Sequence, residues 1–214
     1  MKDKFKEWLS QSGLIGIFRG VQPDEVVDVV GAAINKGLSI VEVPLNSPEP
    51  LRSIQTLSQA FSGKALVGAG TVTSVEEVDA VAEADGKLIV TPYARTEVVI
   101  HAKKLGLFAV PGALTPTEIS AMYAVGADAV KIFPAEMMMP TVLKGLRAVL
   151  PSQLLMIPVG GISLDNMAAY TSAGANGFGL GSSLYRVGDN AESVALKAES
   201  FVNQMKSLKR ADTT

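Results

Sequence analysis

The chain has 214 residues, of which 48% are hydrophobic and 19% charged, with a formal net charge of −2. This length is enough for one substantial core, and we expect a single domain over residues 1–214. The absence of cysteine excludes disulfides, thiol nucleophiles and thiolate metal sites, and His101 is the only histidine for a metal cluster or a Ser-His-Asp triad.

The charge pattern gives no sign of a polymeric or membrane partner. Basic residues are spread along the chain, so we expect no nucleic-acid binding. No apolar run reaches the roughly 18 residues of a membrane-spanning helix. The N-terminal segment MKDKFKEWLSQSG is too charged for a secretory signal. We therefore expect a cytoplasmic protein.

Strand-like and helical patterns alternate along the chain. A helix is predicted over residues 2–11. The apolar runs typical of strands lie at residues 14–18, 39–43, 65–69, 88–90, 107–110, 128–133, 154–159 and 177–180. The segments between these runs have helical spacing, and a last helix is predicted over residues 194–205.

Local signals mark where several helices begin and end. The segment from Asp24 to Lys36 is predicted to place Val26, Val27, Val30 and Ile34 on one buried face. Ser74, with Glu77 three residues later, predicts a capping box. The glycines expected to end helices in the left-handed conformation are Gly37, Gly106, Gly126 and Gly174.

Eight strands that are each followed by a helix must run parallel with crossover connections. The fold class is therefore α/β, and we predict a (β/α)₈ TIM barrel with an extra N-terminal helix that covers its bottom. The alternative is an open doubly wound sheet. The regular units show no topological break, which favours closure.

In such a barrel the active site lies at the carboxyl ends of the strands, where several polar residues are found. Lys131 lies in the apolar run at 128–133 and is predicted to point inward, with Val130 and Ile132 outward. A buried ammonium tends to lose its proton, and a neutral amine can attack a carbonyl carbon. A lysine paired with a buried acid, or one reaching outward, stays possible.

Glu42 is predicted to point inward by the same alternation, with Val41 and Val43 outward. A carboxyl group near the Lys131 amine can move protons to and from a substrate. A plain buried ion pair with Lys131 is the alternative interpretation.

Two glycine turns indicate a phosphate site. Gly160 and Gly161 precede a helix that we expect Ser163 to cap, and Gly181 and Ser182 begin a turn after the last strand. Backbone N–H groups at helix starts bind phosphate, and barrels of this type often use the loops after the last two strands. Tight turns also need glycine, so a structural role is the alternative.

The assembled residues resemble the family of 2-keto-3-deoxy-6-phosphogluconate (KDPG) and 2-keto-3-deoxy-6-phosphogalactonate (KDPGal) aldolases. The motifs that carry the resemblance are IGIFRG, VEVPLNSP, GAGTV, VTP, PG, VKIFPAE, VGGI and GLGSSLYR, and they extend from residue 15 to residue 186. The resemblance implies a class I aldolase, homotrimeric and without metal or cofactor, that cleaves a phosphorylated keto acid to pyruvate and glyceraldehyde 3-phosphate.

The resemblance also implies a role for each matching residue. It makes Lys131 the Schiff-base lysine and Glu42 the general acid and base. The substrate-binding residues it implies are Arg19, Thr71, Pro92 and Phe133. The phosphate-binding residues it implies are Gly160, Gly161, Gly181 and Ser182.

One position departs from the gluconate branch, which often has arginine where this chain has Asn46. The LNSP form resembles the galactonate branch, so KDPGal is the expected substrate, and KDPG is a possible second one. Two other functions stay open: a phosphosugar isomerase or epimerase that uses Glu42 as a base without an imine, and a non-catalytic sugar-phosphate binder.

Overall fold

Strands and helices alternate in the computed structural model, which describes residues 2–211 and the side chains of residues 4–210. The elements in chain order are α1 (Lys2–Ser12), β1 (Leu14–Ile17), α2 (Val26–Asn35), β2 (Ile40–Pro44), α3 (Pro50–Ala60), β3 (Leu66–Gly70), α4 (Val75–Glu83), β4 (Leu88–Val90), α5 (Thr96–Lys104), β5 (Phe108–Val110), β6 (Gly112–Ala113), α6 (Pro116–Ala124), β7 (Val130–Ile132), the 3₁₀ helix η1 (Ala135–Met137), α7 (Pro140–Arg147), β8 (Met156–Pro158), α8 (Met167–Ser172), β9 (Phe178–Leu180) and α9 (Ala191–Ala211).

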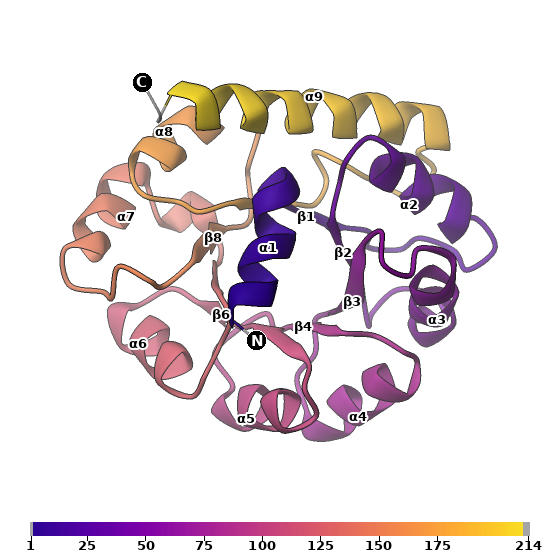
Figure 1. Cartoon of the computed structure of the whole chain (residues 1–214), viewed down its shortest axis with the longest axis horizontal. Coiled ribbons are helices and arrows are strands. Elements are labelled where there is room, and N and C mark those ends of the chain that lie inside the picture. Colours follow the sequence, from indigo (N-terminus) through magenta and orange to yellow (C-terminus); the bar gives the residue numbers. More distant parts are fainter. Residues whose placement is uncertain (1, 212–214) are drawn as a thin grey trace.

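The strands form two sheets, with the orders β5-β4-β3-β2-β1-β9 and β6-β7-β8. Every strand pair in the described part of the chain is parallel. An isolated parallel bridge between Val159 and Gly179 links the end of β8 to β9. Figure 1 shows the helices α2 to α9 in a ring around the strands. The prediction of an α/β fold with parallel strands is confirmed, and each predicted apolar run contains a strand.

The strand segment predicted at 107–110 extends further than expected, to Ala113. Pro111 divides this segment into β5 and β6. Proline has no N–H to donate to a ladder, which explains the interruption. Around this residue the segment changes partner. Gly112 N donates to Thr91 O at 3.1 Å, on the side of β4, and Lys131 N donates to Pro111 O at 2.9 Å, on the side of β7.

Helix α1 closes one end of the strand layer. It crosses in front of the strands in Figure 1, on the side of their amino ends. Phe5 is 0% exposed, and its ring centroid lies 5.8 Å from that of Phe108 at the start of β5. Phe5 and Leu9 join one apolar cluster with inward-facing strand residues, namely Ile15, Ile17, Ile40, Leu66, Leu88, Val90, Val110, Ala129, Ile157 and Val159. The predicted covering helix is therefore present.

A second apolar cluster fills the space between the strands and the outer helices. Val41 and Val43 of β2 and Val130 and Ile132 of β7 belong to it. The alternation predicted for these two strands is confirmed, so Glu42 and Lys131 point to the opposite, inner side.

The predicted helix ends are confirmed where a side chain or a glycine defines them. Ser74 and Glu77 form a capping box at the start of α4. The four glycines predicted to end helices all have positive φ, from 75° at Gly106 to 103° at Gly37.

The predicted buried face of α2 is wrong at one position. Val27 is 39% exposed, whereas Val29 is 4% exposed and packs in the core. Successive residues of a helix are separated by about 100°, so Val27 turns away from the face that Val26, Val30 and Ile34 share.

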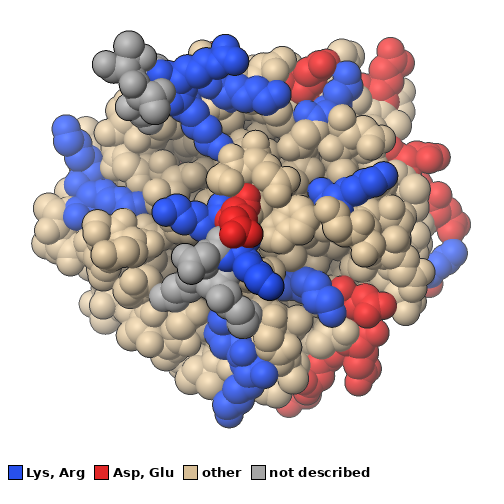
Figure 2. Space-filling model, in the orientation of Figure 1, with Lys and Arg blue, Asp and Glu red and all other residues tan. Residues whose placement is uncertain are grey.

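The charged side chains show no single basic block on the face that α1 crosses. Figure 2 shows Lys and Arg spread over this face, while Asp and Glu lie mainly along the right-hand edge, over α2, α3 and α4. None of the helices within residues 2–211 combines the length and the apolar character needed to cross a bilayer.

Candidate active site

A cavity of about 450 Å³ opens at the carboxyl ends of the strands, on the side opposite α1. Nearly all of the predicted site residues line it: Arg19, Thr71, Pro92, Lys131, Phe133, Gly160, Gly161, Gly181 and Ser182. Glu42 lies deeper, in a small inner cavity that shares Lys131 with the large one. The parallel strands thus bring together residues that are far apart in the sequence, as predicted.

The Lys131 side chain enters the floor of this cavity from β7. The residue is 7% exposed, and its Nζ lies 4.6 Å from the centroid of the Phe133 ring. Burial lowers the pKa of the Lys131 amine, because an ammonium loses its hydration there. The charge of Glu42 opposes this shift by raising the pKa, and that of Arg19 adds to the lowering.

Glu42 is buried in the strand layer, at 2% exposure, and its Oε2 has no hydrogen-bond partner. Burial raises the pKa of Glu42 to about 7, and the positive charges of Lys131 and Arg19 limit the rise. A carboxyl group that titrates near neutral pH can both donate and accept a proton under ordinary conditions.

The charges of Glu42 and Lys131 influence one another although the two groups form no ion pair. The ion pairs that the described residues form within 4.0 Å do not include Lys131. Both residues line the inner cavity, which has about 10 Å³ and otherwise mainly apolar walls. A space of this size holds about one water molecule. The plain buried ion pair that the sequence left open is therefore not the arrangement observed.

Gly70 makes room for the Glu42 carboxyl group. A Cβ atom at residue 70 would lie 1.3 Å from Glu42 Oε2, so the GAGTV motif needs glycine at this point. Thr71 follows with φ of 59°, a left-handed conformation that is uncommon outside glycine. Such backbone strain persists where the surrounding structure enforces it and is frequent at functional sites.

Arg19 is exposed at the cavity rim, and its Nη1 donates to the side chains of Asn46 and Thr71, the latter at 3.5 Å. Its described contacts are therefore polar side chains and not the carboxylate of a surface salt bridge. Asn46 thus fixes the orientation of the guanidinium group from outside the cavity wall.

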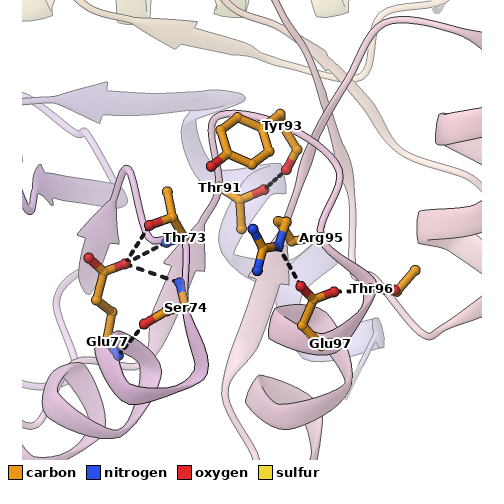
Figure 3. Close-up of polar contacts among 8 residues, drawn as sticks. All are labelled: Thr73, Ser74, Glu77, Thr91, Tyr93, Arg95, Thr96 and Glu97. Carbon is orange, nitrogen blue, oxygen red and sulfur yellow. Dashed lines mark hydrogen bonds and ion pairs between the residues drawn. The ribbon is translucent and has the colours of Figure 1, made fainter.

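The loop after β3 is held by the cap of α4, as Figure 3 shows. Glu77 Oε2 accepts hydrogen bonds from Thr73 N at 2.5 Å, Thr73 Oγ1 at 3.1 Å and Ser74 N at 3.2 Å. These bonds fix the chain immediately after Thr71.

The loop after β4 is held in a similar way. Thr91 Oγ1 donates to Tyr93 O at 2.5 Å and accepts from Gly112 N at 3.1 Å. The backbone on both sides of Pro92 is fixed as a result, and Arg95 Nε binds Glu97 Oε1 at 2.5 Å where α5 begins.

The glycine loops meet at one wall of the cavity. Gly160 and Gly161 have φ of 103° and 61°, and a Cβ on either would lie within 2.8 Å of the Glu136 side chain. Four backbone N–H groups of the two loops have no acceptor among the described residues, namely those of Gly161, Ile162, Ser182 and Ser183. Free backbone N–H groups in neighbouring loops are a feature that can bind a phosphate.

The predicted helix after Gly161 is wrong in its start and in its cap. Helix α8 begins only at Met167 and is six residues long. Ser163 N instead donates to Asn166 Oδ1 at 3.0 Å, within a turn. A short helix that starts five residues beyond Ile162 adds little dipole field here, so the free loop N–H groups are the main positive feature of this wall.

Several lining residues were not predicted from the sequence. They are Ile17, Val159, Ile162, Gly179, Ser183, Tyr185 and Arg186. Arg186 could have been found, because it is a cation that closes the same GLGSSLYR motif as Gly181 and Ser182. The apolar ones carry no signal that separates them from ordinary strand residues.

His101 lies outside the cavity on α5, with Nε2 2.6 Å from Asp79 Oδ1, as expected for an outer helix. A search of the described residues finds no group of three or more histidine, aspartate or glutamate side chains arranged to hold a metal ion.

Comparisons with known proteins identify relatives over most of the chain. Residues 5–196 match the family described as "Aldolase: KDPG and KHG aldolase". The 2-dehydro-3-deoxy-6-phosphogalactonate aldolase of Escherichia coli K12 is 44% identical over 92% of this chain and 96% of its own. A "Native KDPGal structure" is also 44% identical, covers 92% of this chain and 96% of its own, and has a TM-score of 0.90.

A designed protein shares the same architecture. It is a cube-shaped, highly porous cage made by fusing symmetric oligomeric domains, and it is 43% identical with a TM-score of 0.91. The match covers 94% of this chain and 74% of the designed one.

Gly70→Ala tests the steric link between Gly70 and Glu42. The new methyl group must displace the carboxyl group, so we expect it to lower the free energy of unfolding by about 2 kcal/mol, the cost of overpacking. In a Glu42→Ala background the clash disappears, and the same change should cost less than about 1 kcal/mol. Denaturant unfolding of the four proteins measures this difference.

Gly145→Ala is the matched control, because Gly145 lies in α7 and the added Cβ would meet no atom within 4 Å outside its chain neighbours and its own helix backbone. It should stabilise the protein slightly, as glycine is a poor helix former. An equal cost of Gly70→Ala with and without the Glu42 side chain would contradict the link.

Proposed function

The chain belongs to the KDPG and KHG aldolase family, and we propose that it is a class I aldolase that cleaves KDPGal, or 2-dehydro-3-deoxy-6-phosphogalactonate, to pyruvate and glyceraldehyde 3-phosphate. One observation carries the proposal. The Lys131 amine, its pKa lowered by burial, lies at the floor of a cavity whose rim carries free loop N–H groups. The cavity therefore offers an amine nucleophile and a phosphate cradle together.

The first half of the proposed reaction forms the imine. The neutral Lys131 amine attacks the C2 carbonyl carbon of the keto acid and gives a carbinolamine. Glu42 in its acid form protonates the departing hydroxyl through the water that the inner cavity admits, and water leaves. The product is an iminium ion between Lys131 and C2, and Glu42 is now ionised.

The second half breaks the carbon chain. The Glu42 carboxylate removes the proton of the C4 hydroxyl, the C3–C4 bond breaks, and its electron pair moves into the iminium as an enamine. Glyceraldehyde 3-phosphate departs with C4 as its aldehyde carbon. Glu42 returns the proton to C3, and water hydrolyses the resulting imine to release pyruvate and the free amine. A carboxyl pKa of about 7 suits these alternating roles.

The two ends of the substrate fit the two sides of the cavity. We assign the pyruvate end to Thr71 and Pro92, whose loops are fixed by hydrogen bonds, and to Phe133, whose ring lies beside the Lys131 amine. Arg19 at the rim can bind substrate oxygens with its charge.

We assign the phosphate to the opposite wall, at Gly160, Gly161, Gly181 and Ser182. This assignment is supported by the position of the four residues in the cavity lining and by the free N–H groups of their loops.

The galactonate epimer is supported by a residue and by relatives. Asn46 stands where the gluconate branch often has arginine, and it binds Arg19 at the rim. The 44% identical relative from Escherichia coli is named for the phosphogalactonate substrate. Activity on the gluconate epimer as well is compatible with this site.

We further propose that the two sheets are arcs of one closed (β/α)₈ barrel in a single domain over residues 1–214. The change of partner at Pro111 and the bridge between Val159 and Gly179 support closure at both junctions. Residues 1 and 212–214 of that range lie outside the described residues.

We also propose that the protein is a homotrimer in the cytoplasm and acts without metal or cofactor. The symmetric oligomeric domains of the designed cage support the oligomer.

Neither alternative function is favoured. An isomerase or epimerase would use Glu42 and the glycine loops but would leave the buried Lys131 amine without a role. A sugar-phosphate binder would need neither Lys131 nor Glu42. Membership of an aldolase family makes imine chemistry the better account of both residues.

Lys131→Met is expected to lower pyruvate release from KDPGal by about a thousandfold or more, because it removes the nucleophile. Borohydride with pyruvate should leave a reduced adduct on Lys131 of the wild-type protein, located by peptide mass spectrometry. Lys104→Met on α5 is the control, since an exposed helical lysine should matter by less than about twofold. Pyruvate release without an adduct on Lys131 would sink the mechanism.

Glu42→Gln is expected to lower the pKa of the Lys131 amine further, because the ionised carboxylate stabilises the ammonium form. Arg19→Met should move the same pKa upward, because the Arg19 charge lowers it. The pH dependence of pyruvate trapping by cyanoborohydride reports this pKa in each variant. Shifts of the same sign in both variants would show that the charges do not act on Lys131 as described.

The substrate preference gives the last prediction for this site. The specificity constant kcat/KM should be about tenfold higher for KDPGal than for KDPG, the worth of roughly one hydroxyl contact. Asn46→Arg places a second cation beside Arg19 and should reduce this ratio, whereas Asn203→Arg on the exposed side of α9 should not. A coupled pyruvate assay measures both, and an unchanged ratio in Asn46→Arg would exclude a role for Asn46.

A further inference from the structure

Cations occupy three places around the cavity: Arg19 at one side of the rim, Lys131 at the floor and Arg186 near the glycine loops. The first two have roles in the proposed reaction. Arg186 has none so far, although it directly follows the turn that contains Gly181 and Ser182.

Backbone hydrogen bonds and buried side chains hold the turn after β9, immediately before Arg186. Gly181 O accepts from Leu184 N at 2.9 Å and from Tyr185 N at 3.0 Å. Leu184 and Tyr185 are buried, and the Tyr185 ring centroid lies 5.6 Å from that of Phe18. Tyr185 also binds Glu25 through its hydroxyl group at 3.2 Å. The backbone at residue 186 is therefore anchored to the core immediately beside the cavity.

The Arg186 side chain folds back over this turn. Its Nε donates to Ser182 O at 3.2 Å, so the guanidinium group lies against the loop whose N–H groups at Ser182 and Ser183 are free. The Nε bond leaves both terminal nitrogens of the guanidinium group for another acceptor.

The acid nearest in sequence to Arg186 is occupied elsewhere. Asp189 Oδ2 accepts the backbone N–H of Arg186 at 2.8 Å and the Lys197 ammonium at 2.6 Å. Among the described residues, no carboxylate forms an ion pair with the Arg186 guanidinium. The hydrogen bond from Lys197 is the main cause that lowers the pKa of Asp189, and the positive charge of Arg186 contributes to the lowering. The guanidinium group is therefore held at the cavity without a direct ion-pair partner among the described residues.

We propose that Arg186 is the charged partner of the substrate phosphate and that it makes the enzyme select phosphorylated keto acids. This inference rests on the proposed function and deepens it. The glycine loops offer only neutral N–H donors to a group that carries nearly two negative charges. A guanidinium group adds charge-assisted, paired hydrogen bonds that suit a phosphate. An unphosphorylated substrate of the same chain length gains nothing from them.

Arg186→Met removes the charge and keeps much of the length of the side chain. We expect kcat/KM for KDPGal to fall by about 10- to 100-fold, the worth of hydrogen bonds to a charged group, mostly through a higher KM. The ratio of kcat/KM for KDPGal to that for the unphosphorylated 2-keto-3-deoxygalactonate should fall by at least about tenfold. Arg186→Lys should recover part of the ratio, and Arg52→Met, on the exposed side of α3, should leave it unchanged.

Binding of inorganic phosphate, measured by calorimetry on the wild-type and Arg186→Met proteins, tests the same role without catalysis. A dissociation constant at least about tenfold higher in the variant supports the proposal. An unchanged dissociation constant, or an equal loss of kcat/KM for both substrates, overturns it. If wild-type protein forms no pyruvate adduct on Lys131, the proposed function fails, while the phosphate measurement still decides the role of Arg186.

Discussion

The site depends on the cost of burying charge in an apolar strand layer. Lys131 and Glu42 are both almost fully buried, and the inner cavity they share has mainly apolar walls. Burial pushes the pKa of the amine down and that of the carboxyl up, while the mutual attraction of the two charges opposes both shifts. Because the ion pairs of the described residues do not include Lys131, neither group is neutralised by a tight pair with the other.

The rest of the fold keeps that environment intact. Helix α1 brings Phe5 and Leu9 against the inner strand residues and shuts the amino ends of the strands, so the large cavity opens only at the carboxyl ends. Gly70 gives the Glu42 carboxyl group its place, and the strained backbone at Thr71 is held between β3 and the capped start of α4. The surroundings of Lys131 and Glu42 are thus maintained by packing on one side and by hydrogen-bonded loops on the other.

The sequence predicted most of this site because strand alternation and parallel topology both follow strict rules. Alternation in two short strands placed Lys131 and Glu42 inward, and the parallel topology required the strand ends to converge. The sequence-based prediction failed at two places, one in a local turn and one on the face of a helix. Ser163 was expected to cap a helix, but Asn166 binds its N–H within a turn and α8 begins later. Val27 looked as apolar as Val26, and only the packing of α2 showed which of its faces is buried.

By itself, the sequence determined the class of fold, the inward direction of the two central residues and the glycine turns, since these follow from local spacing and backbone freedom. Its motifs also pointed to the family that the comparisons established. Only the tertiary structure decided that Glu42 and Lys131 line one inner cavity without forming an ion pair, and that Arg186 lies against the loop of the free N–H groups with no ion pair of its own among the described residues. Distances between side chains on different strands are set by how the whole layer packs, and no local pattern contains them.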